Sequence, residues 1–287
     1  MLENIKKLIF FLKKNKDIYL IESNQDEGFL IDSLKDEKYI GLDTEFSWRK
    51  TYYPELSILQ ISTESKIFLI DCLKFKKFDL LNKILEKKDK LIVMHSSRSD
   101  TTVLSTNLKI KIKNIFDIQI AEKYIYGGEI KNYGAIVLNH FGHKLDKSET
   151  NSNWLKRPLD YNQLEYAADD VNFLIPIYKA QLKKLKKTDK LDIVFSESRR
   201  EADLGNQELH VSRVKKLKKA TKDERAIFLW REKQASKKNL PPSYIFEDRS
   251  LRKIAKEIKI KDSNSNILAK LFKDFSSVDD FLKNIKL

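Results

Sequence analysis

Acidic side chains in three separated segments are the residues of this sequence best suited to chemistry. Asp43 and Glu45 stand two positions apart, Asp100 lies far downstream, and Asp169 and Asp170 follow later still. Carboxylate oxygens are the ligands that hard cations such as Mg²⁺ and Mn²⁺ prefer. These acids are therefore candidate metal ligands, and hydrolysis assisted by metal ions is the chemistry that they would support.

Asp43 and Glu45 lie in residues 39–46, a run with the composition of a strand. Residues i and i+2 of a strand face the same side, so the two carboxylates point together and repel each other unless a cation neutralises them. A solvated sheet face is the alternative interpretation. The apolar residues before Asp43 indicate burial and favour the metal site.

Tyr166 and Asp170 stand four positions apart in a segment with helical spacing, so they share one face of a helix. Periodicity alone does not choose between Asp169 and Asp170, and an exposed tyrosine beside an acidic turn is the alternative interpretation. Asp100 follows a strand-like run and starts a predicted helix, where compensation of the helix dipole would also explain an acid.

Composition excludes several classes of protein. The 287 residues contain 7 glycines, none of them in a phosphate-binding or dinucleotide-binding pattern, so we expect no nucleotide cofactor. Four histidines and the single Cys72 match no common zinc pattern and allow no intramolecular disulfide, which fits the cytoplasm. No apolar run is long enough to span a membrane, and residues 1–16 are predicted to form an amphipathic helix.

The acids must be positioned by the elements of residues 1–209, where strand-like and helical patterns alternate. This alternation predicts an α/β domain with a central sheet. The expected strands are residues 39–46, 56–62, 66–71 and 91–95, and the expected helices are residues 74–87, 99–106, 115–126 and 163–187. Pro176 is expected to kink the last of these helices.

Residues 210–287 form a second predicted domain, which is purely helical and strongly basic. The expected helices are residues 223–238, 248–259, 266–275 and 277–285. This domain holds 21 basic and 10 acidic residues, against 35 and 32 in residues 1–209. A lysine-biased genome would act on both parts, so the asymmetry favours a module that contacts phosphates and binds with salt-sensitive affinity.

Three groups of residues together resemble a known family. The first group is residues 42–46, 49–56 and 59–61, the second is residues 93–100, 103–104 and 115–119, and the third is residues 145–148, Trp154, and residues 156–159 and 163–171. They are similar to the DEDD superfamily of 3′→5′ exonucleases, and specifically to ribonuclease D, over about residues 18–180.

One branch of that superfamily has histidine five positions before the last aspartate, and the other has tyrosine four positions before it. The corresponding residues here are Glu165 and Tyr166, so the chain resembles the tyrosine branch, which selects Asp170 over Asp169. The C-terminal segment is similar to an HRDC domain, a helical nucleic-acid-binding module. The residues that carry this second likeness are residues 229–232, Ala235, residues 239–241, Asp248, Leu251 and residues 254–255.

The resemblance implies a ribonuclease H-like fold, with a mixed sheet flanked by helices, and two bound divalent cations, Mg²⁺ or Mn²⁺. It implies that these are held by Asp43, Glu45, Asp100 and Asp170, with Asp43 as the bridge. It further implies that Tyr166 orients the attacking water. These five residues are the candidate catalytic residues.

Other residues of the motifs are expected to contact the substrate or to support the fold. Thr44, Phe46 and Arg157 are candidate substrate contacts, with core packing as the alternative for Phe46 and an ion pair as the alternative for Arg157. Gln60 and Asp117 are expected to support the site.

The implied activity removes nucleoside 5′-monophosphates from RNA with a free 3′ end, precursor tRNA being the expected substrate of a monomeric enzyme. A DNA-directed 3′→5′ exonuclease uses the same chemistry and stays open as an alternative, because no residue pattern reveals contacts to the 2′-OH. The alternative from another class is a non-catalytic RNA-binding protein on the same fold. The presence of all four acids and Tyr166 argues against it.

Overall fold

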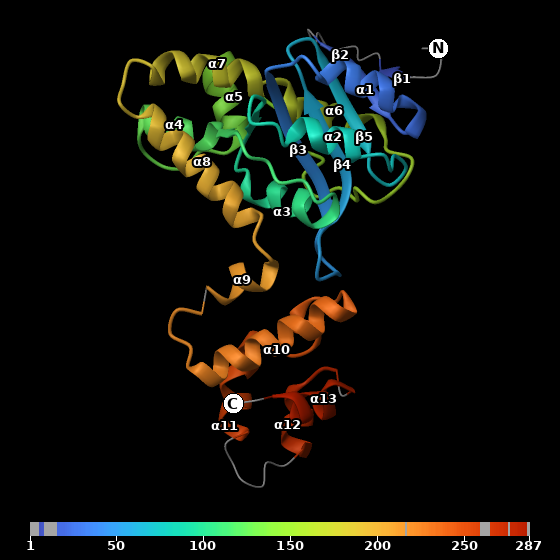
Figure 1. Ribbon diagram of the computed structural model, residues 1–287, viewed down its shortest axis with the longest axis vertical. Helices are drawn as coiled ribbons and strands as arrows, with labels where there is room; N and C mark the ends of the chain where they lie inside the picture. Colours follow the sequence, from blue (N-terminus) through green and yellow to red (C-terminus); the bar gives the residue numbers. More distant parts are fainter. Residues whose placement is uncertain (1–5, 9–15, 216, 259–264, 275, 286–287) are drawn as a thin grey trace. The chain divides into compact units, whose positions relative to one another are not determined.

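The computed structural model describes residues 6–8, 16–215, 217–258, 265–274 and 276–285 (Figure 1). The chain divides into two compact units, the first comprising Met1–Ser47 and Glu55–Asn206 and the second Trp48–Pro54 and Gln207–Leu287. The division near residue 207 lies close to the expected one at 209/210. The inclusion of Trp48–Pro54 in the second unit was not expected.

The first unit contains a mixed sheet, in agreement with the predicted central sheet of an α/β domain. The strands that the structure describes are β1 (Lys6–Leu8), β2 (Asp17–Ile21), β3 (Tyr39–Ser47), β4 (Glu55–Ser62), β5 (Lys66–Asp71), β6 (Leu91–Met94) and β7 (Ile115–Asp117). Their order is β1-β2-β5-β4-β3-β6-β7. Strands β3, β4 and β5 form an antiparallel meander, while β2, β6 and β7 each join it in parallel with a neighbour.

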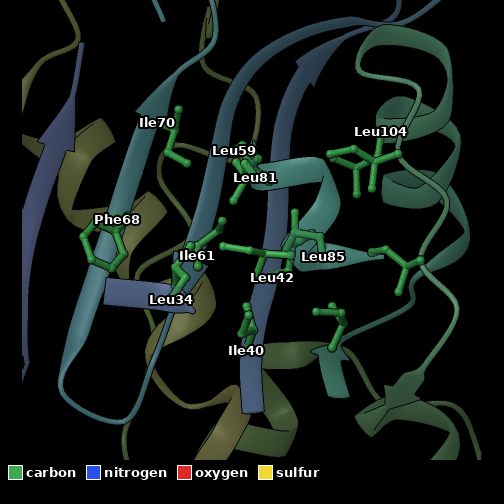
Figure 2. Packing of buried hydrophobic residues seen from close by; sticks show 14 of the residues in the cluster. Leu34, Ile40, Leu42, Leu59, Ile61, Phe68, Ile70, Leu81, Leu85 and Leu104 are labelled. Atoms are coloured by element: carbon green, nitrogen blue, oxygen red, sulfur yellow. The ribbon is translucent and has the colours of Figure 1, made fainter. Parts of the chain in front are cut away.

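Helices cover both faces of this sheet. They are α1 (Glu27–Leu34), α2 (Asp79–Leu85), α3 (Arg98–Asn107), α4 (Ile118–Tyr126), α5 (Tyr133–Phe141), α6 (Tyr161–Asn172), α7 (Leu174–Leu185) and α8 (Leu191–Gly205). Helices α1, α2 and α3 pack on one face, whose buried side chains are shown in Figure 2. Helices α4 to α7 pack on the other face, and α8 contributes side chains to both cores.

Alternation along the strands decides which side chains enter which core. Ile40 and Leu42 of β3 and Ile61 of β4 belong to the core under α1, α2 and α3 (Figure 2). Ile58 and Leu69, of β4 and β5, belong to the opposite core. Because apolar side chains are buried on both faces of the sheet, neighbouring strand residues such as Ile58 and Leu59 are both apolar.

Three expected elements differ from those observed. Residues 1–16 were expected to be helical, but Lys6–Leu8 pairs with β2 as a strand, and residues 1–5 and 9–15 lie outside the described residues. Residues 115–126 begin with a strand, β7, and only then become helical. Residues 163–187 are two helices that meet at Phe173, with Pro176 in the first turn of the second, where a missing N–H costs no hydrogen bond.

The second unit is helical, as predicted. Its described helices are α9 (Leu209–Val214), α10 (Lys222–Lys238), α11 (Leu251–Glu257), α12 (Ser265–Leu271) and α13 (Ser276–Asn284). Its core is built on the aromatic rings of Trp230, Phe246, Phe272 and Phe281, with neighbouring centroids 4.8–6.0 Å apart.

Trp48–Pro54 connects β3 to β4 and contributes to the core of the second unit. The Tyr52 ring is 2% exposed and belongs to the same cluster as Ile227 and Phe246. Its hydroxyl donates to Glu232 Oε2 at 3.0 Å, and Arg213 donates to the same oxygen at 2.9 Å. A buried carboxylate is therefore held by two donors from separate parts of the sequence.

Candidate active site

Strand β3 presents Asp43 and Glu45 on one face of the sheet. In the antiparallel ladder Asp43 stands opposite Gln60, and Glu45 stands opposite Ile58. Ile58 lies in the core covered by α6 and α7, whereas Leu42 lies in the opposite core. Because alternate strand residues share a face, the two carboxylates emerge on the side where α6 contacts the sheet.

Asp100 lies in the first turn of α3 and is 6% exposed. The Thr44 hydroxyl, from the residue between the two β3 acids, donates to Asp100 Oδ1 at 2.5 Å. A short hydrogen bond to a carboxylate is one of the stronger polar contacts in a protein interior. Thr44 therefore connects β3 to α3 and holds the Asp100 carboxylate next to the strand.

Close packing between α3 and the end of α8 positions the helix that carries Asp100. A Cβ atom at Gly205 would lie 2.0 Å from Thr101 Oγ1 and 2.4 Å from the Arg98 carbonyl oxygen. Thr102 Oγ1 donates to the Gly205 carbonyl at 3.0 Å. Only glycine allows this approach of the two backbones, so Gly205 supports the site from a distance.

Asp117 fixes the turn between β6 and α3. Its carboxylate accepts the backbone N–H groups of Ser96 at 3.0 Å, Ser97 at 2.8 Å and Gln119 at 2.9 Å. Ser96 adopts a φ of 55°, a left-handed conformation that is uncommon for residues other than glycine. Asp117 therefore supports the site, as expected, by fixing the turn that precedes α3. The position of α3 in turn determines the position of Asp100.

Helix α6 carries Tyr166 and Asp170 one turn apart. It starts at Asp160, whose side chain accepts the Gln163 N–H at 2.9 Å while the Gln163 side chain accepts the Asp160 N–H, forming a capping box. The Ser62 hydroxyl of β4 donates to the Val171 carbonyl at 2.7 Å. The helix is therefore fastened to the sheet beside Asp170.

Gly41 lets the α6–α7 layer approach β3. A Cβ atom at this position would lie 2.3 Å from Ser62 Oγ and 3.2 Å from Leu174 Cβ. A larger residue would push the helices away from the strand that carries Asp43 and Glu45. Gly41, two positions before Asp43, is therefore required by packing and not by backbone conformation.

The acids from these three segments perturb one another. Burial, and then the charges of Asp170 and Asp100, raises the pKa of Glu45 to about 9. Burial, followed by the charges of Asp100, Asp170 and Glu45, raises the pKa of Asp43 well above its ordinary value. Burial also raises the pKa of Asp100 to about 6. Mutual repulsion of this kind requires that the four carboxyl groups lie close together.

Asp170, and not Asp169, acts electrostatically on the β3 acids. The charge of Asp170 contributes to the raised pKa of both Asp43 and Glu45, whereas Asp169 is among the causes for neither. Burial, and then Asp170, also raises the pKa of Tyr166, whose hydroxyl lies 3.4 Å from Thr150 Oγ1. These pKa shifts agree with the preference for Asp170 that the resemblance to the tyrosine branch implies.

The carboxyl groups are close but do not converge on a single point. No three His, Cys, Asp or Glu side chains within the described ranges are arranged to hold a metal ion. Instead, a hydrogen bond to Asp43, together with the one to Thr44, stabilises the Asp100 carboxylate. The donor set, four clustered carboxyl groups, nevertheless fits hard divalent cations.

Gln60 is an unusual neighbour of the acids. Its side chain is fully buried on β4 opposite Asp43, and neither its amide nitrogen nor its carbonyl oxygen has a hydrogen-bond partner within the described part of the chain. Unpartnered buried amides are rare and costly. The burial agrees with the expected supporting role and places a polar group beside the β3 acids.

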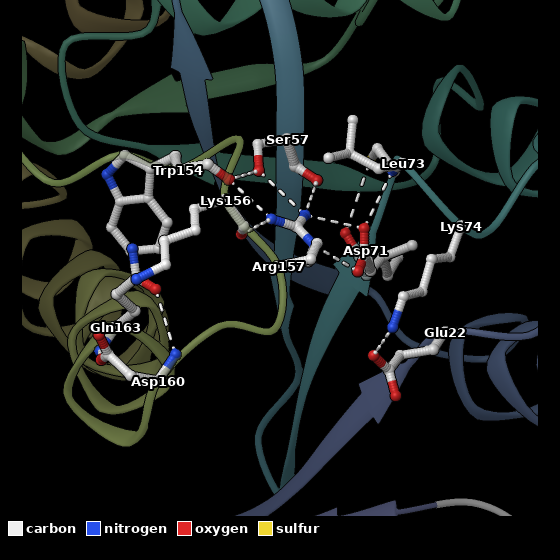
Figure 3. Close-up of polar contacts among 12 residues, drawn as sticks. Glu22, Ser57, Asp71, Leu73, Lys74, Trp154, Lys156, Arg157, Asp160 and Gln163 are labelled. Atoms are coloured by element: carbon white, nitrogen blue, oxygen red, sulfur yellow. Dashed lines mark hydrogen bonds and ion pairs between the residues drawn. The ribbon is translucent and has the colours of Figure 1, made fainter.

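Phe46 and Arg157 make contacts that favour their alternative interpretations. Phe46 packs against the core under α1, α2 and α3. Arg157 forms a bidentate ion pair with Asp71, with N···O distances of 2.7 and 2.8 Å, and its remaining N–H groups reach Ser57 and the Trp154 and Lys156 carbonyls (Figure 3). All five guanidinium N–H groups are used within the protein, so Arg157 ties residues 154–157 to β4 and β5.

Comparison with known proteins gives a consistent picture. A family model described as 3′-5′ exonuclease matches residues 19–186, and an HRDC domain model matches residues 224–262. Ribonuclease D from Desulfotalea psychrophila is 30% identical over 250 residues, covering 82% of this chain and 66% of the relative. The chain spans between 57% and 66% of the length of the first curated relatives that it matches, all of them called ribonuclease D.

Solved structures share the fold. The crystal structure of Escherichia coli RNase D, described as an exoribonuclease involved in structured RNA processing, has a TM-score of 0.80 at 23% identity and covers 93% of this chain and 72% of its own. Brucella melitensis NrnC with bound Mg²⁺ has a TM-score of 0.54 at 21% identity, covering 60% of this chain and 86% of its own. Within the described residues, no helix is both long and apolar enough to cross a bilayer. From its motifs, its sheet and these similarities, the chain belongs to the ribonuclease D family of 3′-5′ exonucleases.

Proposed function

We propose that this protein is a metal-dependent 3′→5′ exoribonuclease that releases nucleoside 5′-monophosphates one at a time from a free 3′ end. The observation that carries this proposal is the electrostatic coupling of Asp43, Glu45, Asp100 and Asp170, which come from three separated segments. Such a concentration of negative charge is costly to the fold and is of use where cations are bound.

Asp43, Glu45, Asp100 and Asp170 would hold two divalent cations, Mg²⁺ or Mn²⁺. When bound, such cations lower the pKa of a water molecule and stabilise negative charge on the leaving 3′ oxygen. The Mg²⁺ bound in NrnC, which shares the fold, supports this choice of cofactor. To hold cations, Asp43 and Asp100 must both be ionised, with their carboxylate oxygens directed toward a common centre.

Tyr166 would hold the attacking water by a hydrogen bond. Burial and the charge of Asp170 raise the pKa of its phenol, so the hydroxyl keeps its proton at neutral pH. A neutral phenol is both a donor and an acceptor, which suits the orientation of a water molecule. It does not suit the removal of the water's proton, so Tyr166 acts by positioning.

RNA is the proposed substrate, and the 3′ end of precursor tRNA is the proposed natural target of a monomeric cytoplasmic enzyme. The description of the E. coli relative as a processor of structured RNA supports this choice. The excess of 11 basic over acidic residues in positions 210–287, 21 minus 10, supports a second contact to the folded body of such an RNA.

The test is incubation of a structured RNA bearing a single-stranded 3′ extension with the purified protein in Mg²⁺ or in EDTA. We expect Mg²⁺-dependent release of 5′-monophosphates from wild type, loss of release with Asp43→Asn or Asp170→Asn, and normal release with the exposed control Asp32→Asn. Undiminished hydrolysis by a folded Asp43→Asn protein would contradict the assignment. Faster release of 5′-monophosphates from a DNA strand of matched sequence than from the RNA would indicate that DNA is the preferred substrate.

A further inference from the structure

Gln60, on β4, carries a buried amide group that the proposed chemistry does not use. Neither Nε2 nor Oε1 of this fully buried side chain has a hydrogen-bond partner among the residues that the structure describes. Both atoms lose hydrogen bonds to water on burial, so the amide lowers the stability of the fold. A buried group with this cost requires an explanation.

The four strand positions around Gln60, on its face of the sheet, show what the amide can reach. Ile58 and Ser62 are two residues away on β4, and Asp43 and Leu69 stand opposite it on β3 and β5. Ile58 and Leu69 are apolar members of the core on this face. The Ser62 hydroxyl already donates to a backbone carbonyl of α6 at 2.7 Å. Asp43 is therefore the flanking residue with the strongest acceptor.

The Gln60 amide can reach the Asp43 carboxylate without a movement of the backbone. Directly opposed residues of antiparallel strands have Cβ atoms about 4.5–5.5 Å apart. A change of side-chain rotamer is enough for the long glutamine side chain to span the remaining distance. Asp43 Oδ1 accepts the backbone N–H of Thr44 at 2.9 Å, and a carboxylate has further acceptor positions for a second donor.

An apolar residue of similar size would suit this position better if packing were the only requirement. Methionine would fill the space between Ile58 and Leu69 without burying a polar group. A local choice that lowers stability, and that no structural contact offsets, is typical of functional sites. The position of Gln60 opposite Asp43 indicates which site this is.

We propose that Gln60 is a positioning residue: its amide N–H donates to the Asp43 carboxylate when that carboxylate binds divalent cations, and so fixes the direction of the carboxylate oxygens. Carboxylates that bind metal ions are commonly held by outer hydrogen bonds of this kind. The inference rests on the proposed function, because it needs Asp43 as a cation ligand. It adds β4 to the three segments that carry the acids.

The test is the substitution Gln60→Met, which keeps a long unbranched side chain and removes the amide. In EDTA this variant should melt about 2–4 °C above wild type, because an unpartnered buried amide has been removed. Its Mg²⁺ affinity, measured by calorimetry, should be about 10- to 100-fold weaker, which is the usual cost of losing an outer hydrogen bond to a metal ligand. Stability and Mg²⁺ affinity should thus change in opposite directions.

Gln181→Met is the matched control. Gln181 is also fully buried, but it lies on α7, and its Nε2 donates to the Ile118 carbonyl and to Glu122 Oε2, both at 3.0 Å. This variant should melt below wild type, because a buried carboxylate and a carbonyl lose a donor. Its Mg²⁺ affinity should equal that of wild type.

A double variant tests whether Gln60 acts through Asp43. In an Asp43→Asn background, Gln60→Met should have little further effect on the remaining Mg²⁺ affinity, because the residue that it positions no longer has a carboxylate. A further loss as large as in the wild-type background would mean that Gln60 acts on the site by another route, and would overturn the inference.

Three other results would overturn it: an unchanged Mg²⁺ affinity in Gln60→Met, an equal loss of affinity in Gln181→Met, or a lower melting midpoint of Gln60→Met in EDTA. These results concern Gln60 alone when wild type binds Mg²⁺ and releases 5′-monophosphates. A wild-type protein that binds no Mg²⁺ would end the proposed function itself.

Discussion

A tyrosine beside carboxylates that are proposed to bind metal ions can either position the attacking water or remove its proton. The protonation state of the Tyr166 hydroxyl distinguishes these two roles. With its pKa raised by burial and by Asp170, the phenol stays protonated throughout the neutral range, so in the proposed reaction it would position water and would not act as the base. Tyr166→Phe removes only the hydroxyl and should lower kcat by about 10- to 100-fold, as for other groups that orient a reactant. Mg²⁺ affinity, measured by calorimetry, should change little. An unchanged kcat would remove Tyr166 from the site.

The acidic cluster should make the stability of the metal-free protein depend on pH in an unusual direction. Burial and its acidic neighbours raise the pKa of Glu45 from 4.5 to about 9, so the folded protein holds a proton that the unfolded chain releases near pH 4.5. Stability is therefore lost as pH rises through this window, instead of being gained. Thermal melting in EDTA should show a midpoint that falls from pH 5 to pH 9.

Added Mg²⁺ should raise that melting midpoint more at pH 8 than at pH 5, because cations bind the ionised carboxylates. Glu45→Gln should flatten the pH dependence, since the amide does not ionise. Glu55→Gln, at the exposed start of β4, is the control and should leave the pH dependence intact. A midpoint that rises with pH in EDTA would show that the four carboxyl groups are not coupled.

At the residue scale the sequence pointed to the candidate acids and to two supporting residues, Gln60 and Asp117, but not to the glycines that position them. Asp43 and Glu45 were proposed because a two-residue spacing on a strand has a fixed consequence, and Asp170 was preferred over Asp169 because of the resemblance to the tyrosine branch. Gly41 and Gly205 carry no such signal, because their importance lies in contacts with Ser62 and Thr101 that are distant in sequence. Close packing of this kind is a property of the fold.

At the scale of elements, the turn between β6 and α3 depends on Asp117. Asp117→Ala would leave three backbone N–H groups without their acceptor. Ser96 would then no longer be held in its left-handed backbone conformation. We expect a loss of about 3 kcal/mol in unfolding free energy, measured with urea. We also expect a fall in kcat, because Asp100 is carried by the helix that this turn starts.

Asp32→Ala, which removes an exposed aspartate paired with Lys35, is the control for that experiment and should change stability by less than about 0.5 kcal/mol. If Asp117→Ala proved as stable as the control, the turn would not depend on the carboxylate. A stable variant with reduced kcat would separate positioning of Asp100 from global stability.

The elements that could be predicted are the ones whose pattern is long and uninterrupted. Strands β3, β4 and β5 have six to nine residues and are rich in β-branched and aliphatic side chains, and the expected ranges differ from them by at most one residue at an end. Strand β7 has three residues and leads directly into α4, so helical periodicity appeared to cover both. The helical expectation for residues 1–16 failed at Lys6–Leu8 because pairing with β2, a tertiary contact, overrides local amphipathicity.

At the scale of the whole molecule, sequence composition predicted the basic helical domain in residues 210–287. It did not predict that Trp48–Pro54 contributes to the core of that domain. Trp48–Pro54 belongs to the same compact unit as Gln207–Leu287, and Tyr52 is buried there against Glu232. Deleting residues 210–287 would therefore expose Tyr52 and remove its hydroxyl's acceptor. A truncated protein would lose part of a hydrophobic core as well as its RNA contacts, so a change in RNA binding could not be assigned to either loss. Substitution of charged residues in the intact chain avoids this problem.

Exchange of exposed lysines for glutamine in the second unit isolates the electrostatic contribution to RNA binding. Lys218, Lys219, Lys222 and Lys253 are exposed, so their replacement should not disturb the aromatic core. Each lysine that neutralises a phosphate adds about 0.7 to the slope of log affinity against log salt for a single strand and about 0.9 for a duplex. We expect the fourfold variant to bind a structured 3′-extended RNA more weakly at low salt, with a slope smaller by up to about 2.8 if all four lysines contact a single strand and about 3.6 if all contact a duplex.

The control removes the same charge from the first unit, at the exposed residues Lys83, Lys87, Lys88 and Lys113. If affinity followed net charge alone, both fourfold variants would lose the same slope, and the basic excess of residues 210–287 would have no special role. If the second unit binds the RNA, only the variant with substitutions in that unit has a smaller slope of log affinity against log salt. A short oligonucleotide that reaches only the acidic cluster should then be hydrolysed at the same rate by both fourfold variants, because the proposed chemistry depends on the carboxylates of the first unit.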